Sequence, residues 1–241
     1  METYTIEPMM HNGVALQGGT SHYFGDGFAK AFGIQYQSKE NKLEYPHQTS
    51  WGMTTRLIGA IIMTHGDDNG LVLPPAVAPI QAVIIPVAQH KEGVLEKAAE
   101  LKASLEAAGI RVKLDDSDNS PGWKFAEYEM KGVPVRIEMG PRDIENGQCV
   151  IVTRHNMEKT VVSIENIEET VAAKLQEVRD GMYAKALANR EKRTYSCTTI
   201  DEIKEALAAH GDSFVKAMWC GEEACELKMK EVAGMSSRCI P

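Results

Sequence analysis

Two short segments of the chain combine glycines with hydroxyl side chains, a combination suited to holding a small polar molecule beside a phosphate group. The first covers residues 17–25 and the second covers residues 50–56. The second runs directly into residues 57–63, an apolar stretch with helical spacing. Arg56 and the backbone N–H of Thr54 are therefore expected at a helix N-terminus, where unpaired N–H groups and the helix dipole attract anions.

Two other groups of residues have the side chains of metal ligands. His65 and Asp67 form one group, but a helix that ends with a histidine in its last turn and Gly66 after it explains this stretch more simply. Cys220 and Cys225 form the other, although a structural zinc needs four ligands. The five cysteines are widely scattered, and their odd number fits a reducing compartment better than a disulfide framework.

A chain of 241 residues can bury one large core or two to three small ones, which would position these residues. Three prolines between residues 73 and 79 cannot continue a helix or a central strand, so they indicate a linker. Beyond it, strand-like apolar runs alternate with helical patterns, which predicts a mixed sheet with helices on its faces. The expected strands are residues 82–87, 111–114, 133–137, 149–152 and 160–163, and the expected helices are residues 94–108, a short helix from 121, and 167–190.

A last unit begins near Tyr195. Thr199 and Glu202 match the capping-box pattern, which predicts a helix over residues 203–209 with Gly211 just beyond its end. The other expected elements of this unit are a strand over residues 214–219 and a helix over residues 222–232.

The composition is that of an ordinary soluble globular protein, with 43% hydrophobic and 25% charged residues. No apolar run approaches the roughly 18 residues needed to span a membrane, so we expect a cytoplasmic protein without a membrane partner. The net charge of −8 argues against bulk coating of nucleic acid. It still permits an acidic protein to recognise RNA through a local patch.

Several separated blocks together resemble the class II aminoacyl-tRNA synthetases, and specifically the prolyl-tRNA synthetase family of the archaeal and eukaryote-like type. The blocks are residues 4–7, 19–22, 45–52, 122–125, 131–136 and 239–241. The resemblance implies a fold of mixed α/β and α+β class in three parts. These are a partial class II core with an antiparallel sheet over residues 1–72, a mixed-sheet α/β anticodon-binding domain over 80–192, and a truncated α+β C-terminal domain over 195–241.

The resemblance also implies residue roles in forming prolyl-adenylate from proline and ATP, before the prolyl group passes to tRNA. Protein groups in such a reaction mainly position the reactants and stabilise charge on the phosphates. Arg56 would hold the γ-phosphate of ATP, as the arginine of class II motif 3 does. His22 would be the second catalytic position, although such a histidine by itself is more often a packed loop residue. The further ATP-binding positions would be Gln17, Thr20, Gly52 and Thr54, and the proline pocket would be formed by His22, Ser50, Trp51 and Gly52.

In this family, class II motifs 1 and 2 would precede residue 1, and with them the arginine that contacts the α-phosphate. We therefore expect the chain to be inactive by itself. The intact enzyme would be a homodimer that uses ATP with magnesium, proline and tRNA(Pro). The family often binds zinc in its last domain, with two ligands at Cys220 and Cys225 and two beyond Pro241, so we expect no bound zinc here.

Residues 124–159 carry both positive and negative charges along their length. Such a stretch can be a solvated surface, or it can recognise splayed anticodon bases, whose edges are bound by carboxylates, arginines and lysines. By resemblance, the anticodon contacts would lie at Glu129, Arg136, Arg142, Asp143 and Lys159. Two other interpretations stay open: a stand-alone, non-catalytic tRNA-binding or regulatory paralogue, and a partner that completes a split enzyme.

Overall fold

The computed structural model describes residues 2–238, and the chain divides into two compact units. One unit comprises Met1–Thr64 and Asn189–Pro241, and the other comprises His65–Ala188. The chain leaves the first unit at the end of α2 (Arg56–His65) and re-enters it near the end of α6 (Ile167–Lys192). Among the described residues, no helix combines the length and the apolar character that crossing a membrane requires.

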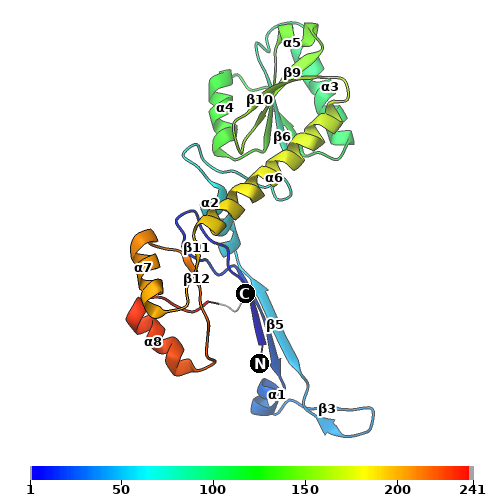
Figure 1. Ribbon diagram of the computed structural model, residues 1–241. Coiled ribbons are helices and arrows are strands. Elements are labelled where there is room, and N and C mark those ends of the chain that lie inside the picture. Colours follow the sequence, from blue (N-terminus) through cyan, green and yellow to red (C-terminus); the bar gives the residue numbers. More distant parts are fainter. Residues whose placement is uncertain (1, 239–241) are drawn as a thin grey trace. The chain divides into compact units, whose positions relative to one another are not determined.

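The unit His65–Ala188 is built on a mixed five-stranded sheet with the strand order β10–β9–β8–β6–β7 (Figure 1). β6 is parallel to β7 and β8, whereas β9 is antiparallel to β8 and β10. Parallel neighbours need a crossover, which α3 (Val94–Ala107) and α4 (Pro121–Met130) supply. The strands are β6 (Ala82–Pro86), β7 (Val112–Leu114), β8 (Val135–Met139), β9 (Gln148–Thr153) and β10 (Lys159–Ser163). The predicted alternation of strands and helices is confirmed.

Alternation of side chains gives this sheet two different faces. One face points into the main core, beneath α3 and α6. Helix α4 covers the opposite face (Figure 1). A smaller core lies there, in which Val83 and Ile85 pack with Tyr128 of α4. Val161 of β10 lies on this second face by register and is 61% exposed. The β10 end of the second face is therefore open to solvent.

Local side-chain caps explain where several helices begin. The Ser120 hydroxyl accepts the N–H of Trp123 at 3.4 Å, and Pro121 occupies the first helical position of α4, as expected. Thr199 likewise accepts the N–H of Glu202 at the start of α7 (Ile200–His210). The short helix α5 (Pro141–Glu145), which follows β8, was not expected from the sequence.

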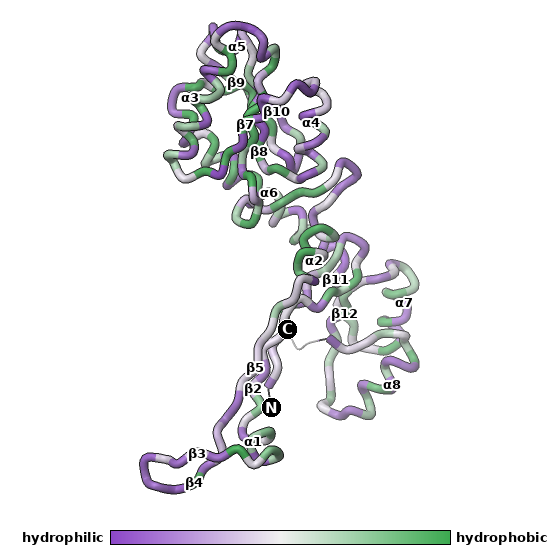
Figure 2. The backbone as a smooth tube through the Cα atoms, turned by 180° about the vertical axis from the view of Figure 1, so that it is seen from behind, coloured by the Kyte–Doolittle hydropathy of each residue, from purple (hydrophilic) through white to green (hydrophobic). Residues whose placement is uncertain are grey.

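The other unit contains a three-stranded antiparallel sheet with the order β1–β2–β5, formed by β1 (Glu2–Ile6), β2 (Gly19–Gly25) and β5 (Gln48–Met53). Helix α1 (Gly27–Phe32) and a small hairpin lie between β2 and β5 in the sequence. The hairpin strands are β3 (Tyr36–Gln37) and β4 (Leu43–Glu44). Figure 2 shows this hairpin as hydrophilic and α2 as largely hydrophobic.

The C-terminal part of the same unit pairs two short parallel strands beside two helices. β11 (Thr194–Ser196) pairs with β12 (Phe214–Lys216), and α7 is followed by α8 (Glu223–Ala233). The amide of Asn189 donates to the carbonyl of Met10 at 3.2 Å, which ties this part to the N-terminal residues of the unit. The predicted fold class is confirmed: an antiparallel sheet, a mixed-sheet α/β unit and a small C-terminal α/β part.

Candidate functional sites

The first candidate site lies on the neighbouring strands β2 and β5. Their register places Thr20 opposite Gly52 and His22 opposite Ser50. Residues directly opposite in an antiparallel pair share one face of the sheet, so these four positions face the same way. Trp51 alternates to the other face and is 79% exposed. The structure thus brings four of the predicted substrate residues together and places Trp51 apart from them.

Arg56 connects the two glycine-rich segments. Helix α2 begins at Arg56, whose backbone N–H donates to the hydroxyl of Thr54 at 3.3 Å. The Arg56 side chain reaches the first segment, where its Nη1 donates to the carbonyl of Gln17 at 3.4 Å. An exposed guanidinium at a helix start, beside hydroxyls and glycines, can bind an anionic group such as a phosphate.

The second candidate site centres on Arg136 of β8, which is 6% exposed. Its Nε donates to a carboxylate oxygen of Glu138 at 2.9 Å, and its Nη1 donates to Glu129 of α4. The guanidinium also lies 4.3 Å from the ring centroid of Phe125. Buried charges need such pairing, since an unpaired charge loses its hydration. One arginine pairs with two carboxylates here, so carboxylate oxygens of the cluster remain able to accept further hydrogen bonds.

A row of residues crosses three strands beside this cluster. Arg136 of β8 pairs with Val152 of β9, which in turn pairs with Lys159 of β10. All three lie on the second face of the sheet, where Arg136 and Val152 are buried and Lys159 is exposed. The other two predicted contacts, Arg142 and Asp143, lie in α5 beyond the far end of β8. Asp143 there accepts the backbone N–H of the residue three positions earlier at 2.9 Å.

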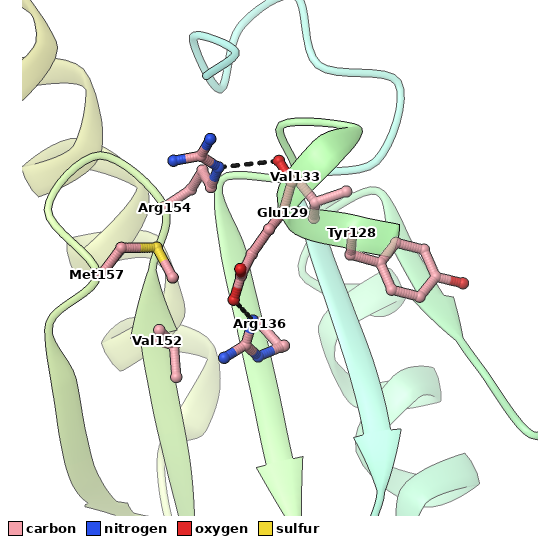
Figure 3. Close-up of a pocket in the computed structure, with 7 residues that line it drawn as sticks. All are labelled: Tyr128, Glu129, Val133, Arg136, Val152, Arg154 and Met157. Carbon is pink, nitrogen blue, oxygen red and sulfur yellow. Dashed lines mark hydrogen bonds and ion pairs between the residues drawn. The ribbon is translucent and has the colours of Figure 1, made fainter. Parts of the chain in front are cut away.

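A small cavity lies beside Arg136, and Figure 3 shows its lining. The Glu129 side chain points toward Arg136, while the guanidinium of Arg154 approaches the backbone of Glu129 from the other side (Figure 3). Seven residues line the cavity: Tyr128, Glu129, Val133, Arg136, Val152, Arg154 and Met157. Arg154 was not predicted from the sequence as a site residue, although a charged residue directly after a buried strand is a recognisable signal.

A buried polar network holds α4 in place, and it was not predicted from the sequence either. Lys124 of α4 is 1% exposed, and its ammonium donates to Gln89 at 3.1 Å and to the backbone carbonyl of Asp115 at 2.9 Å. The Tyr128 hydroxyl donates to the carboxylate of Asp115 at 2.9 Å. Burial by itself would raise the pKa of Asp115, but hydrogen bonds from Ser117 and Tyr128 and the nearby ammonium hold that pKa below its usual value.

The two cysteines considered as metal ligands are both exposed thiols, one just before α8 and one in its first turn. Cys220 and Cys225 belong to the described part of the chain, whereas Cys239 lies outside it. Within residues 2–238, no group of three or more histidine, cysteine, aspartate and glutamate side chains is arranged to hold a metal ion.

Comparison with known proteins gives matches along the whole chain. Residues 81–174 match the family described as "Anticodon binding domain", and residues 200–241 match "Prolyl-tRNA synthetase, C-terminal". The chain is 62% identical to a proline–tRNA ligase of Ruminiclostridium cellulolyticum and 60% identical to that of Lachnospira eligens. Each match covers 99% of this chain and 50% of the relative. The chain therefore spans about half the length of these curated relatives.

A solved structure is similar over the same extent. The crystal structure of prolyl-tRNA synthetase from Cryptosporidium parvum, complexed with L-proline and AMP, superimposes with a TM-score of 0.92 at 40% sequence identity. The match covers 99% of this chain and 52% of that one.

Proposed function

Because this chain belongs to the prolyl-tRNA synthetase family, we propose that its unit His65–Ala188 recognises the anticodon of proline tRNA. The chain corresponds to the C-terminal portion of an enzyme of the archaeal and eukaryote-like type. We further propose that its β2, β5 and α2 segments contribute part of the site for ATP and proline. The chain spans about half the length of these relatives, so the activity of the whole enzyme is part of the proposal.

The cluster around Arg136 carries the anticodon proposal. It lies inside the segment that matches the anticodon-binding family, on a sheet face that is open toward β10. Guanine presents N–H donors on one edge and two acceptors on another, so a paired carboxylate and guanidinium can bind it. Glu129 and Arg136 are such a pair, and exposed Lys159 lies in the same row for a phosphate or a base.

The test is binding of the 241-residue chain to proline tRNA and to the same tRNA with its anticodon guanines replaced by adenines. We expect weaker binding to the replaced tRNA. Arg136→Ala should reduce the preference by about 1–3 kcal/mol, the value of one base-edge contact. Replacing bases at the acceptor end of the tRNA should weaken binding less than replacing the anticodon guanines does. Equal affinity of the wild-type chain for proline tRNA and unrelated tRNAs would contradict the proposal.

Salt dependence separates base recognition from simple attraction to phosphate. If Lys159 contacts a phosphate, Lys159→Ala should weaken the binding of all tRNAs alike. It should also reduce the slope of log affinity against log salt concentration. Arg136→Ala should leave that slope nearly unchanged, because a contact to a base edge neutralises no phosphate. The same change in slope for both variants would indicate that neither residue reads a base.

The ATP and proline proposal rests on Arg56 beside Gln17 and on the face shared by Thr20, His22, Ser50 and Gly52. It is tested by proline-dependent ATP–pyrophosphate exchange. We expect no measurable exchange from the chain by itself, and partial activity after addition of a separately expressed N-terminal half of a relative. Arg56→Ala should then remove most of that activity. Exchange by the purified chain without the added half would refute the view that its site is partial.

A further inference from the structure

A second arginine holds Glu129 from the side opposite Arg136. Arg154 is 2% exposed, and its Nε donates to the backbone carbonyl of Glu129 at 2.9 Å. Glu129 lies in the last turn of α4, where a cation is favourable, and its carbonyl also accepts the N–H of Gly132 at 3.0 Å. Figure 3 shows the two arginines on either side of Glu129, one at its backbone and one at its carboxylate.

The remaining donors of Arg154 are engaged by an aspartate far away in the sequence. Its Nη1 and Nη2 donate to the two carboxylate oxygens of Asp67 at 2.7 and 2.6 Å, across 87 residues. Such a bidentate pair fixes the plane of the guanidinium as well as its position. Asp67 accepts a further hydrogen bond from the N–H of Asn69 at 2.9 Å, which holds its carboxylate in the turn.

The turn that carries Asp67 is itself fastened to the end of α4. The N–H of Leu71 donates to the carbonyl of Met130 at 3.0 Å. A side chain added at Gly70 would meet the backbone of Met130 at 2.5 Å, and one added at Gly132 would meet Leu71 at 2.7 Å. Only glycine permits this close approach at both positions. The segment after α2 therefore packs directly on the helix turn that contains Glu129.

We propose that Asp67 and Arg154 are positioning residues for anticodon recognition: they set the place of the Glu129 carboxylate against Arg136, and so determine the preference for the anticodon guanines. This inference rests on the proposed function, since it concerns the same recognition site. Small displacements of a hydrogen-bonding pair reduce selectivity strongly, because recognition depends on the direction of each bond.

The test measures tRNA preference in the full 241-residue chain, using proline tRNA and the tRNA with anticodon guanines replaced by adenines. Asp67→Asn keeps the shape of the side chain but replaces one acceptor oxygen with a donor group, which breaks the bidentate pair. We expect the preference to fall about fivefold or more, with affinity for the replaced tRNA nearly unchanged. The control is Asp68→Asn in the same turn, because Asp68 makes no ion pair with any residue in the described range 2–238.

A double-mutant cycle with Glu129→Gln separates positioning from general loss of stability. If Asp67 acts through Glu129, then Asp67→Asn should reduce the preference little further once Glu129 is changed. Additive losses of preference would overturn the proposal. Arg154→Lys, which keeps the charge but not the bidentate geometry, provides a second variant. If this buried substitution prevents folding, the result for Asp67→Asn decides the question.

The two proposals fail in different ways. If the wild-type chain prefers proline tRNA but Asp67→Asn keeps the full preference, the positioning role is refuted and anticodon recognition stands. If the wild-type chain shows no preference, both proposals are refuted together.

Discussion

The ammonium of Lys124 lies 3.6 Å from the carboxylate of Asp115, with both side chains almost completely buried. Removing one member of a buried pair leaves an unpaired charge, which typically costs about 3–5 kcal/mol. Lys124→Met should therefore destabilise the unit His65–Ala188 by about 3 kcal/mol in urea unfolding. In combination with Asp115→Asn, the loss should be clearly smaller than the sum of the single losses. Additive losses would show that the two groups do not depend on each other.

The Asp67–Arg154 pair predicts an acid-sensitive contribution to stability. Hydrogen bonds from the Arg154 guanidinium hold the pKa of Asp67 below its usual value. A carboxyl group whose pKa is lowered by folding stabilises the protein above the pKa of the unfolded chain, and this contribution is lost as the pH falls through the folded pKa. Asp67→Asn should therefore be more destabilising at pH 7 than at pH 3, as measured by urea unfolding. A difference that is constant with pH would contradict this prediction, and Asp68→Asn is the control.

The cysteines should differ strongly in reactivity. Burial raises the pKa of the Cys149 thiol to about 11, which keeps it protonated and shielded at neutral pH. Cys220 is exposed, and the N–H of Glu222 lowers the pKa of its thiol. Iodoacetamide at pH 7.5 should therefore modify Cys220 rapidly and Cys149 only after denaturant is added. Mass spectrometry of the labelled peptides measures both rates, and equal rates in the native protein would contradict the prediction.

Local stability should be lowest in the sheet β1–β2–β5. Tyr4 of β1 is 68% exposed and Trp51 of β5 is 79% exposed, whereas Ile84 of β6 and Ile137 of β8 are fully buried. Few buried apolar contacts and open strand edges permit local opening, and also association between chains. Hydrogen exchange should therefore be faster in β1 and β5 than in β6 and β8. Equal protection of the amides in both sheets from hydrogen exchange, measured for a monomeric chain, would count against this expectation.

The sequence by itself determined the elements of the unit His65–Ala188, because the signals are local. Apolar alternation and helical spacing predicted β6, α3 and α6, and the Ser120–Pro121 pair predicted the start of α4. Arg56 is likewise found at the start of α2, as its place before an apolar stretch indicated. The short elements α5 and β3–β4 carry too few periodic residues to be recognised in this way.

Only the tertiary structure decided which charged side chains meet. Arg136 contacts Glu129 because α4 packs on one particular face of the sheet, and the order of strands places Lys159 in the same row. The pairing of Asp67 with Arg154 spans 87 residues and depends on the turn after α2 lying against the end of α4. Such contacts follow from strand order and from the packing of helices on a sheet, and these are set by the whole core rather than by neighbouring residues in the chain.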